Sequence, residues 1–221
     1  MKDLLFYERP ADGTAIGQLI LHHGRGSYEG DLLPIADAID PQHRLHVVAP
    51  RAPLELPGSP GFHWYLVPRV GFPDNATFHA SRESLAAFHD AAFARSGIPA
   101  SRTVLGGFSM GAVMSYALAL SSDRPAPAGV LALSGFIPTL DDWHPTFGDR
   151  QSLRMFVSHG SQDPVISVDF AHSARDQISR AGLPLEYLEF SGGHWVDPEQ
   201  IAPATSWLAA TIDAAATGID L

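Results

Sequence analysis

Cysteine and long apolar runs are both missing from this 221-residue sequence. Without cysteine, the chain has no disulfides, no thiolate metal ligands and no cysteine nucleophile. Such a composition fits a reducing compartment, so we expect a cytoplasmic protein. No stretch approaches the roughly 20 apolar residues that span a bilayer, and the start, MKDLLFYERP, lacks the apolar run of a signal peptide. We therefore expect no stable membrane insertion.

Positive charge is also scarce. Lysine and arginine together number 14 against 24 aspartates and glutamates, which gives a formal net charge of −10. Because nucleic acid is bound through clustered lysine and arginine, this balance argues against nucleic acid as a partner. What the sequence does contain is 45% hydrophobic and 17% charged residues, which is typical of a folded chain rather than a disordered one. Its length predicts a single domain over residues 1–221.

Short apolar runs bounded by turn residues are typical of buried strands. Such runs occupy residues 17–22, 44–49, 103–108, 129–133, 153–157 and 185–190, and a further strand is expected near residues 4–8. Between them lie stretches with alanine and leucine at helical spacing, at 32–39, 81–94, 110–120, 170–181 and 198–215. This alternation predicts an α/β fold in which helices cover both faces of a mostly parallel sheet. In such a sheet, ligands bind beyond the carboxyl ends of the strands.

The sequence Gly107-Phe108-Ser109-Met110-Gly111 stands between a predicted strand and a predicted helix. It fits the pattern G-x-S-x-G, in which small neighbours allow a strained turn to hold a nucleophilic serine clear of the sheet. The helix that follows supplies positive potential, and the Met110 N–H can face an oxyanion. We therefore predict that Ser109 is a nucleophile. The alternative is an ordinary glycine-rich turn between a strand and a helix.

A serine needs a base, and the base in turn needs an acid to orient it. His194 follows the last predicted strand on a glycine-rich loop, where it can reach over the sheet to Ser109. Asp163 follows the preceding strand and is the predicted acid. Asp141 and Asp142 are the alternative acids, and their ordinary interpretation is a solvated loop.

The run His22-His23-Gly24-Arg25-Gly26 ends the first strong strand. Glycines let the backbone turn an N–H inward, so the Arg25 N–H is predicted as a second oxyanion donor. The Arg25 side chain has two open roles, binding an anionic substrate or pairing with an acid such as Asp31. The run fits neither of the common nucleotide-binding glycine motifs.

Several histidine pairs could serve as metal ligands. The pairs worth testing are His22/His23, His43/His46 and His159/His172. None fits H-E-x-x-H and none has a clear third ligand, so we expect no metal and no cofactor.

The motifs resemble those of the α/β-hydrolase superfamily and, more closely, those of its phospholipase/carboxylesterase family, which includes small bacterial carboxylesterases and acyl-protein thioesterases. The resemblance covers essentially the whole chain, and it rests on L-H-H-G-R-G at 21–26, A-P-R-A-P at 49–53, G-G-F-S-M-G-A at 106–112, S-H-G-S-Q-D-P-V-I at 158–166 and S-G-G-H-W-V at 191–196. Family members frequently have glutamine at the position of Met110, and many have an apolar residue at the position of Arg25. The fold implied is an α/β-hydrolase fold without a separate cap domain.

This resemblance implies a serine esterase with a catalytic triad of Ser109, Asp163 and His194, and with the N–H groups of Arg25 and Met110 as the oxyanion hole. Such an enzyme hydrolyses carboxylic esters through an acyl-enzyme. The alternatives are an acyl thioesterase or lysophospholipase with the same triad, and a hydrolase-fold protein that binds without catalysis. The expected partner is a small ester or thioester, and the family implies a monomer or homodimer.

Aromatic and aliphatic residues near the strand ends predict an apolar substrate pocket. They are Phe62, Trp64, Tyr65, Phe136, Ile137 and Trp195, and the alternative is that each packs against the core. The longest candidate cover is the loop over residues 54–78, so we expect an open site for esters of short to medium acyl chains.

Overall fold

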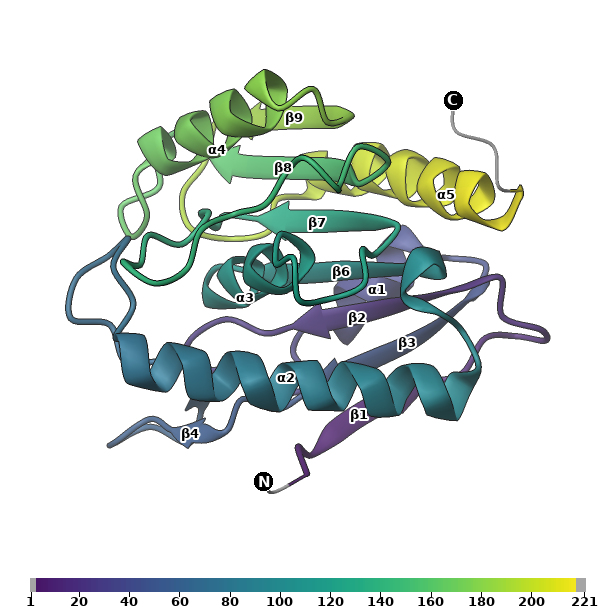
Figure 1. The fold of residues 1–221 in the computed structure, drawn as a ribbon, viewed down its shortest axis with the longest axis horizontal. Helices are drawn as coiled ribbons and strands as arrows, with labels where there is room; N and C mark the ends of the chain where they lie inside the picture. The colour runs from purple at the N-terminus through teal and green to yellow at the C-terminus, as the bar shows by residue number, and fades with distance from the viewer. Residues whose placement is uncertain (1–2, 218–221) are drawn as a thin grey trace.

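The computed structural model describes residues 3–217 and contains a seven-stranded sheet (Figure 1). The strand order is β1-β3-β2-β6-β7-β8-β9, and only β1 runs antiparallel to its neighbour. The strands are β1 (Phe6–Arg9), β2 (Gly17–His22), β3 (Leu45–Pro50), β6 (Thr103–Phe108), β7 (Gly129–Leu133), β8 (Arg154–Gly160) and β9 (Leu185–Phe190). A separate two-stranded sheet pairs β4 (Leu54–Glu55) with β5 (Phe62–His63).

Helices cover both faces of this sheet (Figure 1). One face carries α2 (Asn75–Ser96), α3 (Met110–Ala119) and α4 (Val168–Arg180), and the other carries α1 (Leu33–Ile39) and α5 (Ile201–Thr217). Short 3₁₀ turns, η1 (Ala100–Arg102) and η2 (Pro198–Gln200), precede β6 and α5. The predicted α/β class with a mostly parallel sheet is therefore confirmed. Within residues 3–217, no helix has the length and apolar character that crossing a membrane requires.

The two faces explain why the strands read as continuous apolar runs. Successive side chains of a strand point to opposite faces. In β2, Leu19 and Leu21 enter the core beneath α1 and α5, whereas Ile20 enters the core beneath α2 and α3. Since both cores are closed to water, a polar residue is disfavoured at either register.

The predicted bounds hold for β2, β6, β7 and β9, and elsewhere they need correction. The expected strand at 153–157 extends to Gly160, which brings His159 into the sheet. The expected helix at 81–94 begins at Asn75, because the Asp74 carboxylate caps it by accepting the Thr77 N–H at 3.0 Å. The expected cover over 54–78 therefore contains β4, β5 and the first turn of α2.

A buried histidine pair connects β2 to the two helices above it. The Oγ of Ser115 in α3 donates to the Gly111 carbonyl at 3.0 Å, so it accepts from His22 Nδ1–H at 2.8 Å. His22 Nε2 is then left to accept from His89 Nε2–H, 3.1 Å away in α2. Both rings are thus held neutral. Burial lowers the pKa of His22 well below its ordinary value and lowers the pKa of His89 to about 3.

Acidification is expected to destabilise the fold through this pair. The folded-state pKa values lie below those of unfolded histidine, so the stabilisation is complete above about pH 6.5 and falls as pH falls, since only the unfolded chain binds the protons. Urea unfolding of the wild type between about pH 7 and pH 5 should show a loss on the order of 2 kcal/mol for His89 alone. His89→Gln should show a shallower pH dependence. Equal unfolding free energies of the wild type at both pH values would contradict this prediction.

Candidate active site

Ser109 lies on a strained turn between β6 and α3. Its φ of 55° and ψ of −121° are unusual for a residue other than glycine. A Cβ at Gly111 would approach the His22 carbonyl oxygen to 1.9 Å, and one at Gly107 would approach the Gly111 carbonyl carbon to 2.4 Å. Glycine is therefore required at both positions. The Ser109 N–H donates to the Leu133 carbonyl of β7 at 2.8 Å, which anchors the turn to the sheet.

Ser109, His194 and Asp163 form one hydrogen-bonded chain at the carboxyl ends of the strands. Asp163 Oδ2 lies 2.6 Å from His194 Nδ1, and His194 Nε2 lies 2.8 Å from Ser109 Oγ. Because the carboxylate accepts, Nδ1 carries the imidazole proton and Nε2 is free to accept from the Ser109 hydroxyl. The structure thus brings the predicted nucleophile, base and acid together from three separate loops.

The Asp163 carboxylate is fully buried and yet ionised. Its Oδ1 accepts the N–H groups of Val165 and Ile166, each at 2.8 Å. Burial alone would raise the pKa of Asp163, but the hydrogen bonds from Ile166, His194 and Val165 outweigh burial and lower the pKa. The charge is therefore available to stabilise a protonated His194.

A second histidine touches the same carboxylate. His159, which is fully buried at the end of β8, has Nε2 2.8 Å from the Ile166 carbonyl and 3.3 Å from Asp163 Oδ2. The sequence suggested His159 only as a possible metal ligand with His172, but His172 instead pairs with Glu189 at 2.8 Å. Sequence reasoning therefore missed that His159 supports the acid loop. Only its place one residue before Gly160, in the same strand-end run as Asp163, could have indicated this.

Members of the other suggested metal pairs, and one of the two alternative acids, bond to other residues. His22 belongs to the buried pair with His89, and His46 bonds Glu8 at 2.7 Å. Across residues 3–217, no cluster of three or more His, Cys, Asp or Glu is placed to hold a metal ion. Asp141 is exposed, and exposed Asp142 bonds His79 at 3.0 Å.

Two backbone N–H groups near Ser109 have no acceptor within residues 3–217, one in the loop after β2 and one at the start of α3. Neither the Arg25 N–H nor the Met110 N–H donates to any acceptor among the described residues. Paired bonds join Gly26 N–H to the Phe62 carbonyl and Phe62 N–H to the Ser27 carbonyl, each at 2.8 Å, and they hold the loop in place. Two amides beside a serine hydroxyl can stabilise an oxyanion.

His23 and Trp64 support this loop from below. His23 Nδ1 lies 2.8 Å from the Gly24 carbonyl, and its Nε2 accepts the Ala52 N–H at 3.0 Å. The indole N–H of Trp64 donates to the His23 carbonyl at 2.9 Å. The backbone N–H of Trp64 also reaches the sulfur of Met110 at 3.2 Å. The methionine of the serine turn therefore ties that turn to the segment after β5.

A cavity of about 500 Å³ opens beside Ser109 and His194. Of the predicted pocket residues, Tyr65 and Phe136 line it, together with Arg25 and Met110. Further lining residues come from the predicted cover over 54–78 and from the end of the motif at 158–166, but they were not predicted as pocket residues. These residues are Val67, Arg69, Val70, Gly71 and Pro73 in the first segment and Val165 and Ile166 in the second.

The other four predicted pocket residues lie outside this lining. Trp64 is fully buried beneath the loop after β2, and Phe62 lies under the Arg51 guanidinium at 4.5 Å. Ile137 packs into the core, and Trp195 is half exposed with its N–H directed to Asp197 at 3.2 Å. The alternative of packing against the core therefore holds for Trp64 and Ile137, whereas Trp195 is half exposed.

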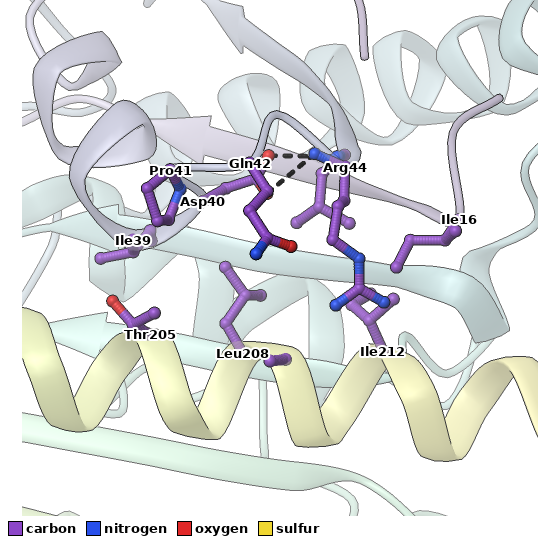
Figure 2. A pocket seen from close by; sticks show the side chains of 11 residues that line it. Ile16, Ile39, Asp40, Pro41, Gln42, Arg44, Thr205, Leu208 and Ile212 are labelled. Carbon is purple, nitrogen blue, oxygen red and sulfur yellow. Dashed lines mark hydrogen bonds between the residues drawn. The ribbon is translucent and has the colours of Figure 1, made fainter. Parts of the chain in front are cut away.

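A second, smaller cavity of about 230 Å³ lies at the amino ends of the strands, on the opposite edge of the sheet (Figure 2). Figure 2 shows Gln42 and Arg44 directed from the loop before β3 toward α5. The charged groups that line this second cavity already have partners. Asp40 accepts from Arg9 and from two backbone amides, and Arg44 pairs with Asp213. This cavity, at the amino ends of the strands, is therefore not part of the candidate site around Ser109.

A family model described as phospholipase/carboxylesterase matches residues 10–212. The chain belongs to this family. It is 24% identical over 209 residues to acyl-protein thioesterase 1 homolog 1 of Dictyostelium discoideum, covering 90% of this chain and 92% of that protein. Membership of the phospholipase/carboxylesterase family makes the chain a hydrolase of the esterase and thioesterase kind.

Solved structures of an esterase and of a carboxylesterase share the fold. Esterase PE8 superposes with a TM-score of 0.80 at 24% identity, covering 95% of this chain and all of that one. A carboxylesterase from Mesorhizobium loti gives a TM-score of 0.79 at 24% identity, covering 93% of this chain and 97% of that one. The fold is therefore the α/β-hydrolase fold of this family.

Gly111→Ala is expected to destabilise the protein by about 3 kcal/mol, because the added methyl would overlap the backbone of β2. Urea or thermal unfolding measures the loss. Gly148→Ala is the matched control, since a Cβ there meets nothing within 4 Å, and its stability should stay near that of the wild type. A Gly111→Ala protein as stable as the control would contradict the close approach.

Proposed function

We propose that this protein is a serine carboxylesterase that cleaves esters of short to medium acyl chains. The observation that carries the proposal is the continuous chain from Ser109 Oγ through His194 to Asp163, placed beside a 500 Å³ cavity. The membership of the phospholipase/carboxylesterase family supports the same reaction class.

In the proposed reaction, Ser109 Oγ attacks the ester carbonyl carbon while His194 Nε2 takes the hydroxyl proton. The resulting oxyanion faces the N–H groups of Arg25 and Met110, which have no other acceptor among the described residues. His194 then gives its proton to the leaving alcohol oxygen. Water, activated by His194, releases the acid from the acyl-enzyme and restores the serine. Asp163 keeps the imidazole in the required tautomer and stabilises its charged form.

The same triad would act on acyl thioesters, and one observation favours this second candidate. The Dictyostelium discoideum relative is named an acyl-protein thioesterase, and its match spans 92% of that protein. Rates on an oxygen ester and a thioester with the same acyl group would distinguish the two. A lysophospholipase is a variant of the same chemistry. A purely binding role is disfavoured, because nucleophile, base and acid are all present and hydrogen-bonded to one another.

We also propose a domain organisation and a cellular location. We take residues 1–221 as one hydrolase domain, supported by a sheet that runs from Phe6 to Phe190, and we place the protein in the cytoplasm, in keeping with its lack of cysteine.

Ser109→Ala should lower the hydrolysis of 4-nitrophenyl esters by roughly 10⁴–10⁶, since no other group can form the acyl-enzyme. Its thermal stability should stay close to that of the wild type. A fluorophosphonate probe should label the wild type and not the variant. Retained turnover or retained labelling in Ser109→Ala would remove Ser109 from the mechanism.

Asp163→Asn should lower kcat by roughly 10⁴, because an amide in that place donates to Nδ1 and favours the tautomer that cannot accept the serine proton. Asp142→Asn is the control, since the side-chain partners of exposed Asp142 among the described residues are His79 and Asn75. Its rate should match that of the wild type. If Asp163→Asn kept full activity, another carboxylate would have to orient His194.

A further inference from the structure

Seven of the thirteen arginines, all within the described residues, have a carboxylate partner. Those with an aspartate or glutamate oxygen within 4 Å are Arg9, Arg44, Arg51, Arg82, Arg124, Arg150 and Arg175. The other six have no such partner within residues 3–217, and two of these, Arg25 and Arg69, line the cavity that contains Ser109. The remaining four are Arg95, Arg102, Arg154 and Arg180. In a chain with a net charge of −10, the cavity beside Ser109 thus gathers two arginines that lack a carboxylate partner.

Arg69 is held in place without being neutralised. It begins a tight turn in which the Phe72 N–H donates to the Arg69 carbonyl at 3.0 Å, and Gly71 takes a φ of 87°. The guanidinium lies 3.6 Å from the centroid of the Phe72 ring. An aromatic face orients a guanidinium but accepts none of its N–H groups in the plane, so these remain available to a ligand.

Packing against α4 also fixes the position of the turn at Gly71. A Cβ at Gly71 would approach the Phe170 ring of α4 to 2.6 Å, so the turn packs closely on that ring. Phe170 in turn contacts Phe136, which lines the cavity, with ring centroids 5.2 Å apart and the ring planes tilted by 39°. The position of Arg69 is therefore coupled to the wall of the cavity.

Arg25 adds positive potential on the side of the cavity next to the predicted oxyanion hole. Its side chain is exposed, and burial together with the Arg25 charge lowers the pKa of the neighbouring His63. The one carboxylate in the lining outside the triad is Asp31, and it makes no ion pair with either arginine. With two arginines against one aspartate, the lining carries an excess of positive charge.

The polarity of the cavity limits the ligand. Buried Tyr65, Met110 and Phe136 make its inner wall apolar, whereas the arginines and the exposed Val67, Val70 and Val165 lie toward solvent. A matching molecule has an apolar segment next to its ester and an anionic group that reaches the rim. A carboxylate suits the planar donor pattern of arginine.

We propose that this cavity selects esters that carry a carboxylate, and that Arg69 and Arg25 bind this carboxylate at the rim. The inference rests on the hydrolase function proposed above and names its substrate class. It also resolves the two open roles of the Arg25 side chain in favour of anion binding over pairing with Asp31. The carboxylate belongs either to the acyl part of the ester or to the leaving alcohol.

Two matched pairs of substrates test the proposal. The first is 4-nitrophenyl hemiadipate against 4-nitrophenyl hexanoate, whose acyl chains are equally long and differ in the terminal carboxylate. The second is 4-carboxyphenyl butyrate against 4-carbamoylphenyl butyrate, which moves the charge to the leaving group. The measured quantity is the ratio of kcat/KM for the charged ester over the neutral one, after subtraction of uncatalysed hydrolysis.

In at least one pair, this ratio should fall about tenfold in Arg69→Gln and further in Arg69→Glu. Arg25→Gln should lower the same ratio. Using a ratio removes effects on the chemical step itself, which matters because the Arg25 backbone belongs to the proposed oxyanion hole. Raising the ionic strength from about 0.05 M to 0.5 M should also lower the wild-type ratio.

Arg95→Gln is the matched control. Arg95 is likewise an exposed arginine that stacks on a phenylalanine, lying 4.5 Å from the Phe6 ring centroid, and it lines a different cavity. Its ratio should equal that of the wild type. If the wild type, Arg69→Gln and Arg25→Gln share one ratio in both pairs, the anion site is overturned while the esterase function stands.

A binding measurement separates the two proposals. Calorimetric titration of Ser109→Ala with monomethyl adipate and with methyl hexanoate needs no turnover. Tighter binding of the charged ester, lost on adding Arg69→Gln to the same protein, would support the anion site even if no ester were hydrolysed. Equal binding of both esters, with neutral esters still cleaved by the wild type, would overturn it.

Discussion

The first turn of α3 lies so close to the end of β2 that no side chain fits between them, and the whole site depends on this approach. Gly111 faces the His22 carbonyl, and Gly107 faces the backbone of Gly111. With both contacts made, the chain must turn sharply at Ser109, whose φ is positive. The strain is offset by the bond from Ser109 N–H to β7 and by the burial of α3 along its entire length. The same approach places the Ser115–His22–His89 chain beneath the serine.

The loops that carry Asp163 and His194 are joined to each other as well as to the sheet. Ser161 N–H donates to the Phe190 carbonyl at 2.8 Å, and Gln162 N–H donates to the Gly192 carbonyl at 2.9 Å. Gly160 lies against the carbonyl oxygens of Gly192 and Gly193, where a Cβ would clash. His194 and Asp163 are thus set by backbone hydrogen bonds, so little conformational entropy is lost when they align with Ser109.

Charge is distributed unevenly around this framework. The buried histidines beneath the site are neutral, whereas Asp163 keeps its charge because backbone and imidazole N–H groups solvate it. The cavity above adds Arg25 and Arg69 to the positive end of α3, within a protein that is acidic overall. Such a local field attracts an anionic group that the rest of the surface repels, and the role proposed for the two arginines in substrate selection follows from it.

The sequence by itself determined the α/β fold, the carboxyl-end location of the site and the residues of the serine, acid and histidine loops, because these follow from local patterns: apolar runs, turn residues and G-x-S-x-G. It did not determine where α2 begins, since the apolar periodicity of this helix is weak and its start is set by the cap at Asp74. Nor did it separate Tyr65 and Phe136, which line the cavity, from Phe62, Trp64, Ile137 and Trp195, which do not. The place of His159 beside Asp163 and the pairing of Arg69 with Phe72 also came only from the tertiary structure. Periodicity specifies which residues are apolar and which elements form, but the direction of a side chain in a loop depends on contacts with elements far away in the sequence.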